Sequence, residues 1–144
     1  MSALKVFIAD DEEPARSRLK ELLGDIAAEV PTSIVGEARH GLEAIERVPT
    51  SRAQVLLLDI EMPGMAGLEV ARHLARLENP PAVVFVTAHD RHAVEAFELN
   101  ALDYLLKPVR AERLADALRK AAVPASEQLA KAAEDAPREY LSVA

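Results

Sequence analysis

The sequence predicts an α/β fold, in which a five-stranded parallel sheet carries helices on both faces. Short apolar runs alternate along the chain with segments whose apolar residues recur at helical spacing. The run at residues 55–58 is apolar at every position, as expected of a strand buried on both faces. Aspartate follows this run, and aspartate also follows the first run at residues 4–9. We therefore expect the polar chemistry at the carboxyl ends of the strands.

The five predicted strands are short, apolar and bordered by turn signals. They cover residues 4–9, 33–38, 55–58, 83–86 and 104–106. The dipeptide Pro63-Gly64 follows the third strand, and Asn79-Pro80-Pro81 breaks the chain before the fourth.

A predicted helix follows each strand. The first begins near Pro14, because the missing N–H of proline costs nothing in the first turn of a helix. The others cover about residues 41–48, 68–77, 91–98 and 110–123. The residues expected to face the core are Leu19, Leu22, Leu23, Ile26, Ala44, Ile45, Val48, Leu68, Ala71, Leu74, Leu77, Phe97, Leu114, Ala117, Leu118 and Ala121.

This alternation favours one particular strand order. Right-handed crossovers in a chain of 144 residues favour the doubly wound, flavodoxin-like order 2-1-3-4-5. In that order the ligand crevice lies beyond the ends of strands 1 and 3. Residues 125–136, after Pro124, are rich in alanine and charge and predict a linker, whereas residues 138–143 look like the start of an unpaired strand.

Composition excludes several classes of protein. The net charge of −7 argues against nucleic-acid binding by this chain, because phosphate contacts need a basic surface. The lack of cysteine excludes disulfides and thiolate metal sites. No apolar run is long enough to span a bilayer, and the first residues do not form a signal peptide. We expect a soluble, cytoplasmic protein.

Acids, a hydroxyl and a lysine stand at the ends of four of the five strands. Asp10 and Asp11 follow the first strand, Asp59 the third, Thr87 the fourth and Lys107 the fifth. Neighbouring carboxylates repel one another, and Mg²⁺, which prefers oxygen ligands, relieves that repulsion. Asp59 is the better placed nucleophile, and the Asp10-Asp11 pair is better placed to hold the metal. The set predicts phosphoryl transfer to Asp59, with Lys107 and Thr87 contacting the phosphoryl oxygens.

Each of these signals also has an ordinary explanation when it stands alone. Acidic residues 10–13 are favoured at the start of a helix. Thr87 is also explained as a helix N-cap, and Lys107 as a solvated loop residue, although a cis bond to Pro108 would fix a tight turn there. His89 and His92 have the spacing of a metal pair, but solvated residues at a helix start explain them better.

Four motifs resemble those of receiver domains of two-component response regulators, which have the CheY-like fold. They are Ile8-Ala9-Asp10-Asp11-Glu12, residues 58–65, Val86-Thr87-Ala88 and residues 104–108, and the resemblance covers residues 4–123. Residues 85–90, 93–98 and 101–109 further resemble LytTR-type regulators. The resemblance implies a receiver domain at residues 1–123. It also implies a linker at residues 124–144 that leads into a C-terminal LytTR-type DNA-binding domain, absent here.

The resemblance also implies a phosphoacceptor and a metal site. Asp59 resembles the aspartate that takes a phosphoryl group from a sensor histidine kinase. Asp11, Asp59 and the backbone carbonyl of Glu61 resemble the Mg²⁺ ligands. Asp10 resembles the acid that acts on the metal through water.

Three further residues resemble the parts that read the phosphoryl group. Thr87 and Lys107 resemble the pair that grips it, and Tyr104 resembles the switch aromatic that turns inward when Thr87 moves. The implied result is a change in the face formed by the fourth helix, fifth strand and fifth helix, which binds a partner or a second receiver and controls transcription. Glu61 and His89, at the mouth of the site, are predicted to tune the lifetime of the phosphoryl group.

Two other functions would use the same residues. A Mg²⁺-dependent phosphatase with Asp59 as nucleophile needs a second acid and a cap over the site, and no insertion supplies a cap. A receiver-fold interaction module that works without phosphorylation remains the alternative, although the intact set of site residues argues against it.

Overall fold

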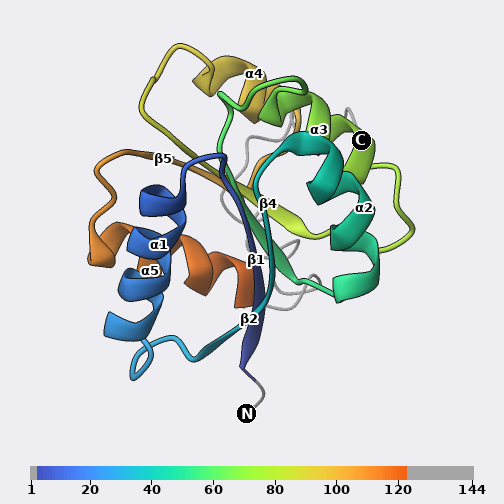
Figure 1. The fold of residues 1–144 in the computed structure, drawn as a ribbon. Helices are drawn as coiled ribbons and strands as arrows, with labels where there is room; N and C mark the ends of the chain where they lie inside the picture. The colour runs from blue at the N-terminus through green and yellow to red at the C-terminus, as the bar shows by residue number, and fades with distance from the viewer. Residues whose placement is uncertain (1–2, 123–144) are drawn as a thin grey trace, which may run out of the picture.

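A parallel sheet with helices on both faces forms the structure, a computed structural model that describes residues 3–122 (Figure 1). The strands are β1 (Leu4–Ala9), β2 (Thr32–Ala38), β3 (Val55–Leu58), β4 (Ala82–Thr87) and β5 (Asp103–Leu106). They pair in the order β2-β1-β3-β4-β5, and every pair is parallel. The predicted fold class and strand order are therefore confirmed. The predicted linker and strand at residues 124–144 lie outside the described residues.

The sheet divides the core into two halves, and helices cover each half. The helices are α1 (Glu13–Asp25), α2 (Gly41–Ser51), α3 (Gly67–Leu74), α4 (Ala93–Glu98) and α5 (Ala111–Ala122). Helices α1 and α5 pack on one face of the sheet, and α2, α3 and α4 pack on the other (Figure 1). None of the helices within residues 3–122 has the length and apolar character needed to cross a membrane.

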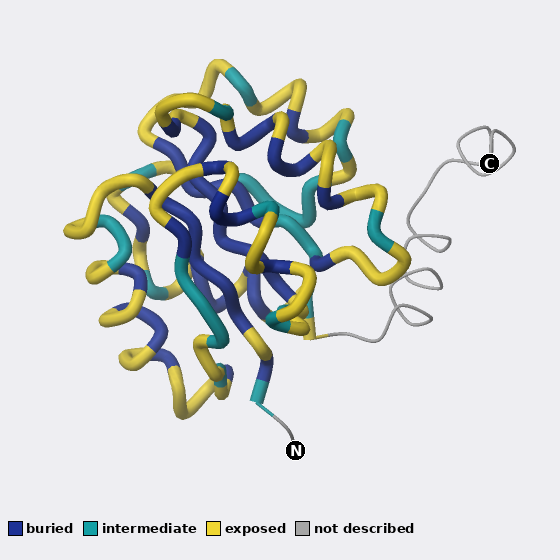
Figure 2. The backbone as a smooth tube through the Cα atoms, turned by 45° about the vertical axis from the view of Figure 1, so that its right-hand side comes forward, coloured by how far each residue is buried: buried dark blue, intermediate teal, exposed yellow. Residues whose placement is uncertain are grey.

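The central strand β3 is buried on both sides. Val55 and Leu57 belong to the half-core under α1 and α5, whereas Leu56 and Leu58 belong to the other half, and all four are fully buried. Figure 2 shows the same burial running through the middle of the sheet. A strand in this position must be apolar at every residue, which explains the unbroken run in the sequence.

The edge strand β2 carries an irregularity. Its register with β1 shifts between Val6, which pairs with Ile34, and Phe7, which pairs with Gly36. A Cβ atom at Gly36 would lie 2.5 Å from the ring of Phe7, so only glycine leaves room for that ring. The bulge thus lets a large aromatic side chain pack against the backbone of the edge strand.

Two predicted helix ends were wrong. Helix α2 continues through Pro49 to Ser51 rather than ending at Val48. The hydroxyl of Ser51 donates to the Val48 carbonyl at 2.7 Å, so side-chain bonds support this last turn. Helix α3 ends at Leu74, and Leu77 packs on the core from the following turn.

Phe97 was also predicted wrongly, because its side chain is 77% exposed. The short helix α4 presents Ala96 to the core, and one further residue along a helix turns a side chain by about 100°. Phe97 and Val94 therefore both face solvent.

Helix α3 begins in direct contact with the end of β3. The Gly67 N–H donates to the carbonyl of Ile60 at 2.8 Å. A Cβ atom at Gly67 would lie 2.2 Å from the carbonyl oxygen of Asp59 and 2.8 Å from the Cα of Ile60. These are backbone atoms, so a larger residue would force the chain that carries Asp59 to move.

Replacing Gly67 should therefore destabilise the fold. We expect Gly67→Ala to lower the free energy of unfolding by about 1–3 kcal/mol, as overpacking does in other cores. The matched control is Gly24→Ala, in α1, where a Cβ atom would meet nothing within 4 Å. That variant should gain up to about 1 kcal/mol from helix propensity. Equal stabilities of the two variants in urea denaturation would contradict the close packing.

Asp103 clamps β5 to α5. Its carboxylate accepts two hydrogen bonds from Arg113, at 2.8 and 3.0 Å, and one from Lys120 at 3.0 Å. Burial alone would raise the pKa of Asp103, but the hydrogen bonds from Arg113, Lys120 and the Tyr104 N–H outweigh it and lower the pKa to about 2.

This clamp should make part of the stability dependent on pH. Because the pKa of Asp103 is lower in the folded chain than its ordinary value of 3.8, the stabilisation is present above pH 4 and is lost as the pH falls toward 2. We expect Asp103→Asn to cost about 1 kcal/mol at pH 7, since its partners are half exposed, and less at pH 3. The control is Asp116→Asn, which breaks an exposed pair with Arg119 and should change little. A cost for Asp103→Asn that is independent of pH in denaturation curves would refute the clamp.

Candidate functional site

Two buried aspartates lie side by side at the carboxyl ends of β1 and β3. Ala9 pairs with Leu58 in the sheet, and the Asp59 N–H donates to the Ala9 carbonyl at 2.9 Å. The Asp10 N–H donates to the carbonyl of Ala38 at 3.1 Å. Asp10 is only 1% exposed and Asp59 5%. Sheet-like hydrogen bonding thus continues one residue past each strand and places the two carboxylates together.

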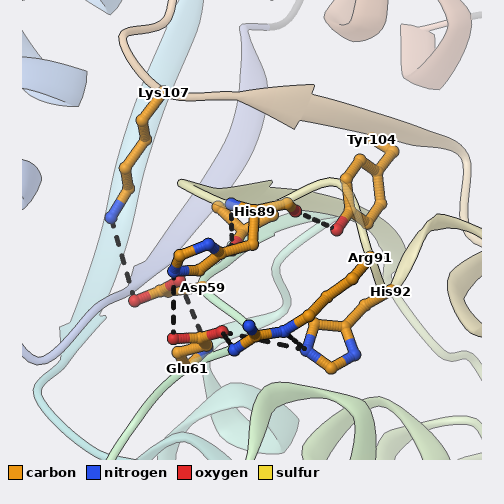
Figure 3. A network of polar contacts seen from close by, with 8 residues as sticks. Asp59, Glu61, His89, Arg91, His92, Tyr104 and Lys107 are labelled. Atoms are coloured by element: carbon orange, nitrogen blue, oxygen red, sulfur yellow. Dashed lines mark hydrogen bonds and ion pairs between the residues drawn. The ribbon is translucent and has the colours of Figure 1, made fainter.

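Lys107 supplies the positive charge between these acids. Its Nζ lies 2.8 Å from Oδ2 of Asp10 and 3.8 Å from Oδ2 of Asp59 (Figure 3 shows the Asp59 contact). The backbone N–H of Lys107 donates to the Thr87 carbonyl at 2.8 Å, which anchors the residue to the end of β4. The peptide bond to Pro108 is cis. Lys107 therefore contacts Asp10 more closely than Asp59.

The two buried carboxylates of this site share one lysine as their cationic partner among the described residues. Burial and, after it, the charge of Asp10 raise the pKa of Asp59 to about 6, because Lys107 and the hydrogen bond from the Glu61 N–H oppose them only in part. Burial alone would lower the pKa of Lys107, but its hydrogen bond to Asp10 and the charge of Asp59 raise it. Lys107 stays cationic, and Asp59 is ionised at neutral pH at an energetic cost that a further cation would relieve.

Three acids that follow β1 could hold that cation. One carboxylate oxygen from each of Asp10, Asp11 and Glu12 lies within 4.8 Å of the others. Asp11 and Glu12 are exposed, so an ion can reach them from solvent. A set of carboxylate oxygens beside a carboxyl with a raised pKa fits a hard divalent cation and not a soft metal. Glu12 was not among the ligands expected from the sequence.

The predicted switch residues meet at the backbone of His89. Thr87 is fully buried, and its Oγ1 accepts a hydrogen bond from the His89 N–H at 3.4 Å. The hydroxyl of Tyr104 donates to the His89 carbonyl (Figure 3). The centroid of the Tyr104 ring lies 6.3 Å from the centroid of the Phe85 ring. No hydrogen bond within residues 3–122 joins the Thr87 hydroxyl to the acids, so Thr87 and Tyr104 are connected to each other but not directly to Asp59.

The carboxylate of Glu61 contacts three other side chains at the mouth of the site. Glu61 accepts a short hydrogen bond from Arg91, and its carboxylate lies 3.4 Å from Nε2 of His89 and 3.8 Å from Nε2 of His92 (Figure 3). Its backbone N–H donates to Oδ1 of Asp59 at 3.4 Å. The two histidines were expected to be solvated, and His89 is half exposed, but both contact Glu61.

Sequence reasoning missed two arginines near the site. Arg91 gave no signal, because it lies in an exposed loop and contacts a residue thirty positions away. Arg16 gave none either, because it is one of several charged residues of α1 and its partner, at 2.8 Å, is the backbone carbonyl of Asp10.

Comparison with known proteins agrees with this geometry. The family model of the response regulator receiver domain matches residues 6–119. The chain is 46% identical over 127 residues to the positive alginate biosynthesis regulatory protein of Pseudomonas aeruginosa, covering 88% of this chain and 50% of that protein. It is 45% identical to the sensory transduction protein LytT of Bacillus cereus, covering 81% of this chain and 46% of that one.

A solved structure shares the fold. The response regulatory domain of mrkE from Klebsiella pneumoniae superposes with a TM-score of 0.73 at 35% identity, covering 81% of this chain and 93% of that domain. The chain spans about half the length of the curated relatives that it matches. It belongs to the response regulator receiver domains of two-component signalling, with regulators of the LytTR type among its relatives.

Proposed function

We propose that Asp59 accepts a phosphoryl group from a sensor histidine kinase, with Mg²⁺ bound beside it. The observation that carries this proposal is the pairing of a buried carboxyl, whose pKa is about 6, with the cationic Lys107 and three adjacent acids. At neutral pH Asp59 is ionised and nucleophilic. Positive charge bound beside the carboxylate lowers its free energy and also offsets the charge that the phosphoryl group brings.

The chain's own residues account for most of the transfer. An oxygen of Asp59 attacks phosphorus, the bond from phosphorus to the kinase's imidazole nitrogen breaks, and the imidazole leaves with that electron pair. Lys107, already within 3.8 Å of Asp59, neutralises charge on the phosphoryl oxygens, and Thr87 donates a hydrogen bond.

We assign the metal site to residues around Asp59. Asp11, Asp59 and the carbonyl of Glu61 would hold Mg²⁺, with Asp10 acting through water. When bound, Mg²⁺ neutralises charge on the carboxylate and on the phosphoryl oxygens.

Phosphorylation would then shift a population of conformations. A phosphoryl group on Asp59 attracts Lys107 and Thr87, and Thr87 shares the backbone of His89 with Tyr104. A movement of Thr87 therefore reaches Tyr104 through one residue. The surface of α4, β5 and α5, where Phe97 is exposed, would change and bind a partner or a second receiver.

We further propose that the signal controls transcription in the cytoplasm, through a C-terminal LytTR-type DNA-binding domain. Residues 1–123 would form the receiver and residues 124–144 the linker to that domain. The relative named as a positive regulator of alginate biosynthesis, twice the length matched here, supports this assignment.

Replacing Asp59 should abolish phosphorylation. We expect no phosphorylated species of Asp59→Asn with acetyl phosphate and Mg²⁺, whereas the wild type gains one phosphoryl group by mass spectrometry. The variant should be at least as stable as the wild type at pH 7. Folding raises the pKa of Asp59, so its ionisation costs stability above pH 6, and asparagine removes that cost. Phosphorylation of the variant would refute Asp59 as the acceptor.

The same reagents test a receiver-fold module that works without phosphorylation. Beryllofluoride, which imitates a phosphoryl group, should shift the NMR signals of Thr87 and Tyr104 in the presence of Mg²⁺. If neither signal shifts, the result would favour an interaction module that works without phosphorylation.

Glu61 and His89 should control how long the phosphoryl group persists. Their contact covers the mouth of the site, so the double variant Glu61→Ala, His89→Ala should admit water and speed dephosphorylation by about fivefold, or about 1 kcal/mol in the barrier. The control is His73→Ala, an exposed residue of α3 that has no part in the network. An unchanged lifetime of phosphorylated Asp59, followed by loss of phosphate in time, would remove this role.

A further inference from the structure

Arg16 joins the acidic loop to the edge of the sheet. Its Nη1 donates to the backbone carbonyl of Asp10 at 2.8 Å, and its Nε lies 3.3 Å from Oε1 of Glu37. The Arg16 side chain is only 11% exposed, unlike that of Arg18, which is 58% exposed. A guanidinium group that is largely buried and satisfied by two partners is held in one place.

Glu37 fixes the other end of this contact. It belongs to β2, where it pairs with Ile8 of β1, so its backbone is part of the sheet. Its second oxygen, Oε2, accepts a hydrogen bond from Lys20 at 3.1 Å. The arginine therefore connects a rigid strand to the loop that follows β1.

The carbonyl of Asp10 matters because it belongs to the peptide that carries Asp11. The carboxylate of Asp10 is already fixed by Lys107 at 2.8 Å and by the Glu12 N–H at 2.9 Å. The carboxylate of Asp11 has no hydrogen bond or ion pair to any residue in the range 3–122, and it is exposed. Its direction therefore depends on the peptide bond between residues 10 and 11, which Arg16 holds.

We propose that Arg16 is a positioning residue for the divalent cation site, and that it acts by orienting the Asp10–Asp11 peptide. This inference rests on the proposed function, which places Mg²⁺ at Asp11 and Asp59. Residues that orient metal ligands without touching the metal commonly affect affinity strongly. Arginine suits the role because its planar fork serves a carbonyl and a carboxylate at once, which the single ammonium of lysine cannot do in the same geometry.

Because Arg16 is positively charged, electrostatic repulsion and positioning predict opposite effects of its removal on Mg²⁺ binding. A fixed cation near an acidic site repels a second cation, so charge alone predicts that removing Arg16 tightens Mg²⁺ binding. Positioning predicts the opposite, because an unheld peptide leaves Asp11 free to turn away. The two explanations thus differ in the sign of the effect.

The experiment measures Mg²⁺ affinity by NMR titration of the unphosphorylated chain. We expect Arg16→Gln to bind Mg²⁺ about tenfold more weakly than the wild type. Arg16→Lys, which keeps the charge but loses the fork, should also bind more weakly. The control Arg18→Gln removes the same charge from the same helix and breaks only a 3.9 Å pair with Glu21, so its affinity should equal or exceed that of the wild type.

Amide exchange in the metal-free chain gives a second measurement. The amide of Glu12, which donates to Asp10, should exchange faster in both Arg16 variants than in Arg18→Gln. Circular dichroism of each variant establishes that it is folded. If Arg16→Gln does not fold, Arg16→Lys takes its place in both measurements.

Unchanged or tighter Mg²⁺ binding by the Arg16 variants would overturn this inference alone, as would equal weakening by Arg18→Gln. A wild type that does not bind Mg²⁺ would overturn the proposed function and this inference with it.

Discussion

The structure depends on two like charges that the sheet forces together. Because β1 and β3 pair in register, Asp10 and Asp59 leave the sheet as neighbours, and both are almost fully buried. Two carboxylates in such a place are unfavourable unless positive charge lies between them. Lys107, carried by the end of β5 from the far side of β4, supplies part of it. Burial and the charge of Asp10 still raise the pKa of Asp59, so a cation bound beside its carboxylate would be stabilising.

The sequence was sufficient to predict the sheet and the placement of the acids. A strand such as β3, buried on both faces, must be apolar throughout, and Asp59 directly after it is conspicuous. The predicted core residues of α1, Leu19, Leu22, Leu23 and Ile26, are all buried, because helical spacing over several turns leaves little freedom. Short elements gave less information. Helix α4 has six residues, too few for a periodic pattern to show which side Phe97 faces.

The contacts around the site were harder to predict than its main residues. Hydrogen bonds to the backbone carbonyls of Asp10 and His89 leave no trace in the sequence, because every residue has a carbonyl. The network at Glu61 joins two loops. The sequence placed His89 with Glu61 at the mouth of the site, but Arg91 and His92 were visible only as residues at the start of a predicted helix. Sequence patterns identify residues that must be of one chemical type, whereas these contacts depend on where the backbone passes.

The bulge in β2 has a consequence for the chain in a crowded solution. A regular edge strand offers unpaired N–H and C=O groups at even spacing, onto which a strand from another molecule can add. The shifted register at Phe7 and Gly36 interrupts that spacing in the middle of β2. The interruption thus hinders edge-to-edge addition of a strand from another molecule, so the sheet has less tendency to grow into an aggregate.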